Sequence, residues 1–171
     1  GRLLMQSRRF AQAAELYLEA ALIDATVAGA ARQEAARARD LAGGPGAIVI
    51  DFPPGAANVV VTARVNGLVS TELRLDPAEE YSVVSVQTAV NAGYARAAAR
   101  RIRFFSDPNA DETPTVQLRT VTVSGITTDR IQAVVVDGYA APVAQGVLGA
   151  TFLSRYRRVE ERSLGRLVLY P

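Results

Sequence analysis

The segment ELRLDPAEEYSVVS covers residues 72–85 and carries three carboxylates in the five positions 76–80. Asp76 comes directly after a strand-like run, and Glu79 and Glu80 follow it beyond Pro77. The chain contains no Cys, His or Trp, which excludes thiol nucleophiles, Ser-His-Asp triads, disulfides and the common zinc sites. Carboxylates and tyrosines are the side chains left for acid–base chemistry. If the chain is an enzyme, the sequence favours a carboxylate enzyme.

Short strands must position these carboxylates. The segment GGPG at Gly43–Gly46 ends a helical pattern, and the chain after it is rich in β-branched residues. Asn-Gly at 66–67 predicts a tight turn, so we expect Val59–Val65 and Leu68–Leu75 to pair antiparallel. Turns and brief helix-prone segments separate the other strand-like runs, which favours a closed or sandwich-like β domain. These runs cover 47–52, 81–85, 101–106, 115–123, a turn and strand within 124–138, and 166–171.

Residues 1–42 have the apolar spacing of antiparallel helices. The segment SRRFAQAAELYLEAALIDAT (7–26) resembles a tetratricopeptide repeat, in which small residues let two helices pack closely. One repeat and the first helix of another would fit, and the usual closing proline is absent. An ordinary helical hairpin is the alternative. The residues that match the repeat are Phe10, Ala13, Tyr17 and Ala20.

The β region resembles a retropepsin-like (retroviral-type) aspartic protease. VTARVNGLVSTELRLDPAEEYSVVS (61–85) is similar to the start of that family's domain, where a hairpin leads into a strand that ends in Asp-Thr-Gly-Ala. GVLGATFLSRYRRVEERSLGRLVLYP (146–171) is similar to its ending, in which a hydrophobic-hydrophobic-Gly motif precedes a short helix and two strands. The resemblance covers 57–171. It implies a mainly antiparallel closed β domain with a short C-terminal helix, and together with the N-terminal helical hairpin expected at 1–42 this makes an α+β fold.

The resemblance places Asp76 at the catalytic aspartate. Two such aspartates share one proton, and a domain of this size supplies only one of them, so the family implies a homodimer with the site on its two-fold axis. The family implies no metal and no cofactor. The implied roles are a substrate groove at Pro77, Ala78, Glu79 and Glu80, a flap at Ser106, Asp107, Pro108 and Asn109, and structural support from Leu148, Gly149 and Phe152.

The chain departs from the family motif, because Asp76-Pro77-Ala78 stands where Asp-Thr-Gly is expected. Proline has neither the hydroxyl nor the N–H that would lock two loops together across a dimer axis. Ala78 adds a methyl group at a close approach, and Glu79 adds like charge beside the aspartates. The sequence therefore favours a catalytically impaired domain. Asp76-Pro77 can also simply begin a turn.

We thus expect a homodimerisation or peptide-binding scaffold, with an active aspartic peptidase as the alternative. The net charge of +2 does not by itself indicate nucleic acid, and no apolar run reaches the roughly 18 residues of a membrane span. The compartment is left open, with a periplasmic or secreted context among the options, because the chain begins inside a helical pattern as a fragment would. The expected organisation is a tetratricopeptide-like segment at 1–42, a linker and first strand at 43–56, and the protease-like domain at 57–171.

Overall fold

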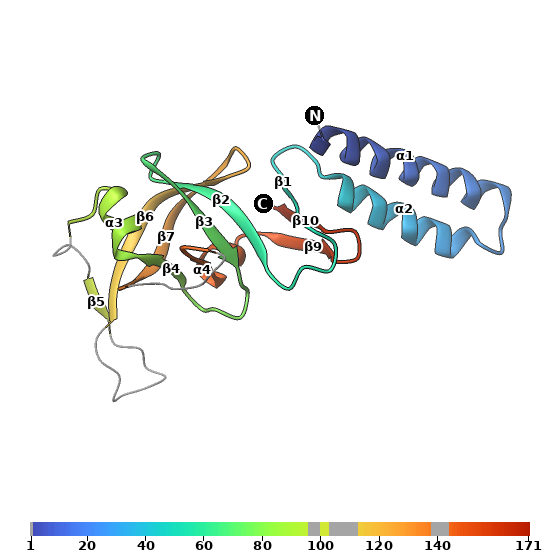
Figure 1. The fold of residues 1–171 in the computed structure, drawn as a ribbon. Helices are drawn as coiled ribbons and strands as arrows, with labels where there is room; N and C mark the ends of the chain where they lie inside the picture. Colours follow the sequence, from blue (N-terminus) through green and yellow to red (C-terminus); the bar gives the residue numbers. More distant parts are fainter. Residues whose placement is uncertain (1, 96–99, 103–112, 138–143) are drawn as a thin grey trace. The chain divides into compact units, whose positions relative to one another are not determined.

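The computed structural model describes residues 2–95, 100–102, 113–137 and 144–171. Its internal contacts divide the chain into two compact units (Figure 1). The helical unit comprises Gly1–Ala56 and Arg157–Pro171, and the barrel unit comprises Ala57–Tyr156. The last fifteen residues therefore group with the N-terminal segment, whereas the sequence analysis assigned them to the β domain.

The helical unit begins with the expected helical hairpin, made of α1 (Arg2–Ile23) and α2 (Ala28–Ala42). The two helices lie side by side in Figure 1. Small side chains fill the contact, because alanines let helix backbones approach closely. Tyr17 is 41% exposed and lies outside this buried set, although the repeat-like pattern placed it with the small residues. Neither described helix is long and apolar enough to cross a membrane. The buried alanines are Ala14, Ala21, Ala31, Ala35 and Ala38.

A three-stranded antiparallel sheet completes this unit. Its order is β1 (Ile48–Asp51), β10 (Arg166–Tyr170) and β9 (Arg157–Glu161), so that β10 is paired along both edges. Four of the five residues of β10 are buried. β10 is therefore the central strand of this sheet and carries much of its buried surface.

Arg166 ties this sheet to the helices. The residue is 1% exposed; its Nε donates to the Leu41 carbonyl (2.7 Å) and its Nη1 to Asp51 Oδ1 (3.2 Å). Its guanidinium also lies over the Phe10 ring, 4.9 Å from the centroid. Burial lowers the pKa of Arg166, and the charge of Asp51 opposes this shift. A buried cation needs such partners, because an unpaired buried charge is strongly destabilising.

The barrel unit is a seven-stranded sheet that closes on itself. The strand order is β2-β3-β8-β4-β7-β6-β5, and β2 also pairs with β6. Most neighbours are antiparallel, but β3 runs parallel to β8 and β4 parallel to β7. The expected α+β fold with a closed β domain is confirmed. The strands are β2 (Val59–Val65), β3 (Val69–Leu75), β4 (Ser82–Ser85), β5 (Arg100–Ile102), β6 (Thr113–Val123), β7 (Ile126–Val136) and β8 (Gly146–Leu148).

The predicted Asn-Gly hairpin joins β2 to β3. The loop between the paired Val65 and Val69 has three residues, and its first two, Asn66 and Gly67, have positive φ values of 52° and 69°. The Asn66 side chain donates to the Ala92 carbonyl, and its Oδ1 accepts the N–H groups of Arg119 and Thr120. One turn residue thus fixes the hairpin against two other segments of the barrel.

Two short helices complete the barrel unit. α3 (Val86–Asn91) begins at Ser85, whose hydroxyl accepts the Thr88 N–H. α3 ends at Asn91, and Gly93 just beyond it adopts a φ of 91° that a right-handed helix cannot contain. α4 (Ala150–Leu153) follows β8. Leu148 and Phe152 are both 0% exposed, and their role as structural support for the site stays a prediction.

We expect Leu148→Ala to lower the free energy of unfolding by about 2–5 kcal/mol, because it leaves a cavity beside β3 and β4. Urea denaturation monitored by circular dichroism measures this change. Leu68→Ala is the matched control, since Leu68 is 62% exposed in the same unit, and it should cost about 0.5 kcal/mol or less. Equal losses in the two variants would contradict the burial of Leu148.

We expect Arg166→Met to destabilise the protein by about 1.5–3 kcal/mol, because the Leu41 carbonyl and the Asp51 carboxylate lose a charged donor. The exposed Arg158 on β9 provides the control Arg158→Met, which removes the same charge at the surface. Thermal unfolding followed at a helical circular-dichroism wavelength compares the two. If both variants melt together with the parent, Arg166 does not tie the sheet to the helices.

Candidate active site

The candidate site begins where β3 ends. Asp76 follows the last residue of β3, and its N–H donates to the Leu148 carbonyl on β8 (3.1 Å). β8 lies between β3 and β4, although those two strands follow each other along the chain. Because β3 and β8 are parallel, they end at the same edge of the sheet. The loop that carries Asp76 is thus positioned by β8, a strand from near the end of the barrel unit's sequence.

The loop itself is a tight turn. Asp76 Oδ1 accepts the Ala78 N–H (3.0 Å), and the Glu79 N–H donates to the Asp76 carbonyl (3.3 Å). Pro77 occupies the second position of this turn, where its fixed φ is favourable. Asp76, Pro77, Ala78 and Glu79 therefore form a turn that is closed by its own hydrogen bonds.

Gly149 lets the chain pass close beneath this turn. A Cβ at Gly149 would lie 2.6 Å from the Glu79 carbonyl oxygen and 2.4 Å from that of Tyr81. Gly146, at the start of β8, is equally confined, since a Cβ there would lie 2.2 Å from the Val83 carbonyl oxygen. Any larger residue would push the loop backbone away. Steric exclusion therefore explains the glycine of the hydrophobic-hydrophobic-Gly motif.

The first turn of α4 holds the loop from below. The N–H of Ala150 donates to the Glu79 carbonyl (2.7 Å) and that of Thr151 to the Glu80 carbonyl (3.2 Å). Ser82 accepts the Gly149 N–H through its hydroxyl (3.2 Å), and its own N–H donates to the Thr151 hydroxyl. The backbone at both acidic residues is therefore fixed, while their side chains are exposed.

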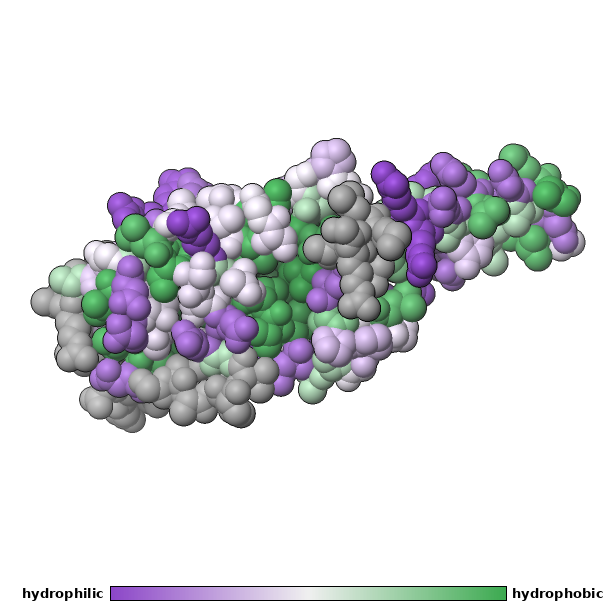
Figure 2. Space-filling view, turned by 45° about the horizontal axis from the view of Figure 1, so that its top comes forward, coloured by the Kyte–Doolittle hydropathy of each residue, from purple (hydrophilic) through white to green (hydrophobic). Residues whose placement is uncertain are grey.

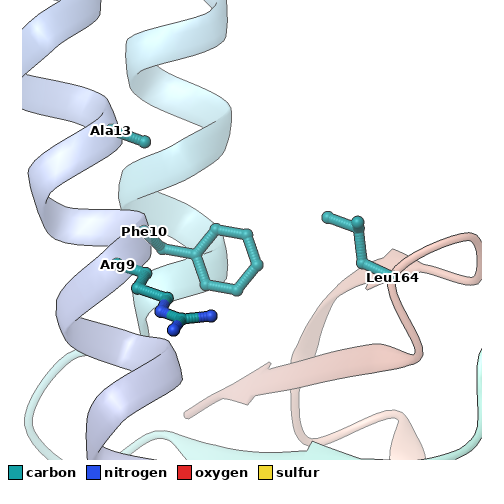
Figure 3. A pocket seen from close by; sticks show the side chains of 4 residues that line it. All are labelled: Arg9, Phe10, Ala13 and Leu164. Carbon is teal, nitrogen blue, oxygen red and sulfur yellow. The ribbon is translucent and has the colours of Figure 1, made fainter.

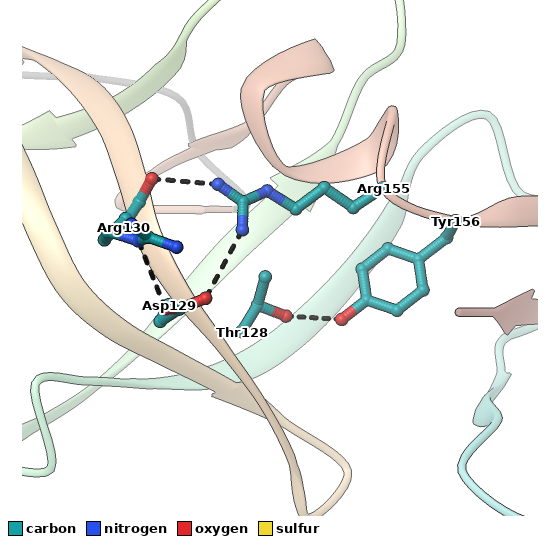
Figure 4. Close-up of polar contacts among 5 residues, drawn as sticks. All are labelled: Thr128, Asp129, Arg130, Arg155 and Tyr156. Carbon is teal, nitrogen blue, oxygen red and sulfur yellow. Dashed lines mark hydrogen bonds and ion pairs between the residues drawn. The ribbon is translucent and has the colours of Figure 1, made fainter.

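A second polar cluster anchors the other end of α4 to β7 (Figure 4). Arg155 Nη2 donates to the Arg130 carbonyl (3.0 Å), and Arg155 Nη1 lies 3.5 Å from Asp129 Oδ1. Arg130 has a φ of 51°, unusual for a residue with a side chain. Thr128 and Tyr156 join through their hydroxyls in the same view. The sequence analysis missed this cluster, because its members are apart in the chain.

Arg74 is the charged neighbour of Asp76 that sequence reasoning missed. Its Nη2 lies 3.0 Å from Asp76 Oδ2, and the two side chains are 29% and 24% exposed. The signal was available, since residues two apart in a strand share one face. Both oxygens of Asp76 thus have a partner within the same chain, one from Arg74 and one from the Ala78 N–H.

The remaining predicted site residues divide into two groups. Pro77, Ala78, Glu79 and Glu80 lie exposed on or beside the turn, and their role as a groove stays a prediction. Ser106, Asp107, Pro108 and Asn109 lie outside the described residues. Within the described part of the chain, no group of three or more Asp or Glu side chains is arranged to hold a metal ion.

The helical unit has a hollow of its own, of about 360 Å³. In Figure 3 the Phe10 ring and the Leu164 side chain face each other across it, with Arg9 at its side. Its lining is mainly apolar. None of the four residues described as lining it carries a carboxylate.

Comparison with solved structures supports the fold. A retropepsin-like aspartic protease from Rickettsia conorii is 18% identical, with a TM-score of 0.56, over 72% of this chain and 90% of that one. The retroviral protease-like domain of Ddi1 from Leishmania major is 14% identical, with a TM-score of 0.48, over 68% of this chain and 96% of that one. At 18% identity, the first similarity shows the retropepsin-like fold alone.

The family is shown by a different comparison. A search among curated proteins gave no match. Residues 61–152 match the model of a family described as "Aspartyl protease", and this segment contains the turn at Asp76, the close approach at Gly149 and the start of α4. Because the match covers more than half of its residues, this chain belongs to the aspartyl protease family.

Proposed function

We propose that this chain is a catalytically impaired aspartic-protease-like domain that serves as a homodimerisation or peptide-binding module. The observation that carries the proposal is the turn at Asp76, which is closed by the Ala78 and Glu79 N–H groups of the same chain. The Ala78 and Glu79 N–H groups are therefore bonded within their own chain.

Peptide hydrolysis by this family's chemistry requires two closely placed aspartates. Two carboxylates must lie about 3 Å apart and share one proton, so that one activates water while the other polarises the carbonyl. Such placement requires the two loops to be locked to each other. Pro77 can neither donate nor accept through a side chain, and the Ala78 N–H is already bonded to Asp76. These features support impaired catalysis.

The scaffold around the loop favours a binding role. The closed barrel, the β8 insertion and the α4 hydrogen bonds are all present. A protease-like groove that has lost its chemistry can still hold an extended peptide by strand pairing. In the helical unit, β10 is paired on both edges and leaves only β1 and β9 for a second chain. We propose that a homodimer would bring the Asp76 turns of two barrel units together, as the family resemblance implies.

The helical hairpin favours a scaffold role, in which it would stack on further helices as tetratricopeptide repeats do. Figure 2 shows hydrophobic residues at the far end of the hairpin, where α1 passes into α2. Leu22, Ile23 and Val27 there are 84%, 86% and 45% exposed. Helical repeats bury such surface only when they stack on neighbours, so we propose that the hairpin contacts further helices.

The second candidate function is an active aspartic peptidase that uses the Asp76 residues of two subunits. The specific observation in its favour is that the Asp76 side chain is 24% exposed. It lies where β3 and β8 end at the same edge of the sheet, in a chain of this family. Cleavage and dimerisation separate the two candidates.

We expect the protein to cleave unfolded polypeptides negligibly between about pH 3 and pH 7, because Pro77 and Ala78 cannot form the lock that would hold two carboxylates in place. Fluorogenic casein, assayed with the parent and with Asp76→Asn, measures this. Glu72→Gln, an exposed change on the same strand, is the control for a general loss of charge. A robust rate that disappears in Asp76→Asn and survives in Glu72→Gln would establish the active peptidase.

We expect the triple variant Pro77→Thr, Ala78→Gly, Glu79→Ala to dimerise more tightly than the parent. Two reciprocal hydrogen bonds of about 0.5–1.5 kcal/mol each should lower the dissociation constant about 5- to 150-fold. Sedimentation equilibrium measures this constant. Glu80→Ala is the matched control, since it removes a neighbouring carboxylate without restoring the lock. If the folded triple variant has the same dissociation constant as this control, Asp76 does not lie at a two-fold axis.

A further inference from the structure

We propose that Arg74 is a positioning residue that holds Asp76 within its own subunit and occupies the carboxylate oxygen that paired aspartates would need. The inference deepens the proposed function and rests on it in treating the Asp76 turn as the vestigial site. Arg74 lies two residues before Asp76, at the end of β3. The two side chains share one face of the strand, which brings Nη2 within 3.0 Å of Oδ2.

The surroundings of Arg74 favour its ion pair with Asp76. In the sheet, Arg74 is paired with Val60 on β2 and with Val147 on β8, so both neighbours in register are apolar. Its Nε is buried without a hydrogen-bond partner in the described structure. Burial of an unpaired donor is unfavourable. The bond to Asp76 offsets part of this cost and keeps the side chain at this edge of the barrel.

The chemistry of the pair differs from that of two aspartates. A guanidinium remains protonated and only donates hydrogen bonds, so it cannot exchange a proton with water or with a peptide carbonyl. With Arg74 on Oδ2 and the Ala78 N–H on Oδ1, each oxygen of Asp76 has a fixed donor. Arg74 thus replaces the proton-sharing partner with a fixed positive charge from the same chain.

The test measures how available the Asp76 carboxylate is. The folded protein is treated with a water-soluble carbodiimide and glycine ethyl ester, and amide formation at each carboxylate is followed by peptide mass spectrometry. In Arg74→Met, Asp76 should react about three- to fivefold faster, the change expected from loss of a partly exposed ion pair. Glu79 and Glu80, on the same turn, are internal references and should react at unchanged rates.

Two further variants separate this role from a structural one. Arg74→Lys keeps the charge and should hold the Asp76 rate within about twofold of the parent. Arg119→Met removes the same charge from an exposed site on β6 and should change nothing. If Arg74→Met does not fold, as judged by circular dichroism, Arg74→Gln is used, and a faster reaction of Asp76 is again expected.

The proposal is overturned if Asp76 reacts at the parent rate in a folded Arg74→Met or Arg74→Gln variant. It is also overturned if Arg74→Lys accelerates the reaction as much as Arg74→Met does. Both results are labelling rates, and they are read without a cleavage or dimerisation assay. Failure of this inference is therefore distinguishable from failure of the proposed function, which those two measurements decide.

Discussion

The structure of the candidate site depends on one close approach, between the backbone at Gly149 and the carbonyls of Glu79 and Tyr81. The absence of a side chain at Gly149 lets β8 end beneath the loop and lets α4 begin there. The N–H groups of Ala150 and Thr151 then bind the loop carbonyls. Close backbone approach of this kind is available only to glycine. This packing explains how the loop backbone keeps its position.

A retained scaffold and an altered loop are physically compatible, because they depend on different interactions. The scaffold uses backbone hydrogen bonds and buried apolar side chains such as Leu148 and Phe152, which are indifferent to the residue at 77 or 78. Catalysis by paired aspartates depends on placing two carboxylates closely and on controlling one proton. Pro77 and Arg74 lie beside Asp76 and not in that core. The fold can therefore outlast the chemistry, and fold alone is weak evidence for function.

The helical unit is stabilised in a different way. Arg166 is buried among a backbone carbonyl, a carboxylate and an aromatic ring that come from α2, β1 and α1. At the end of β10, the Tyr170 hydroxyl donates to the Asp40 carbonyl (2.6 Å), and Arg157 stacks on the Tyr170 ring while it pairs with the Asp40 side chain. Burial raises the pKa of Tyr170, which keeps its hydroxyl available as a donor. Directional polar contacts thus join the hairpin to a sheet that contributes few residues.

The sequence by itself determined the local elements and the position of Asp76. Asn66-Gly67, the β-branched runs and the alanine-rich helices predict their structures from local backbone preference and hydrophobic period, and the ending motif indicated the fold. Tertiary structure alone decided that residues 157–171 group with the helices, that Arg74 reaches Asp76, and that the Arg130–Arg155 cluster anchors α4. The reason is that local preferences act between neighbours along the chain, whereas these contacts join segments that meet only after the sheet has closed.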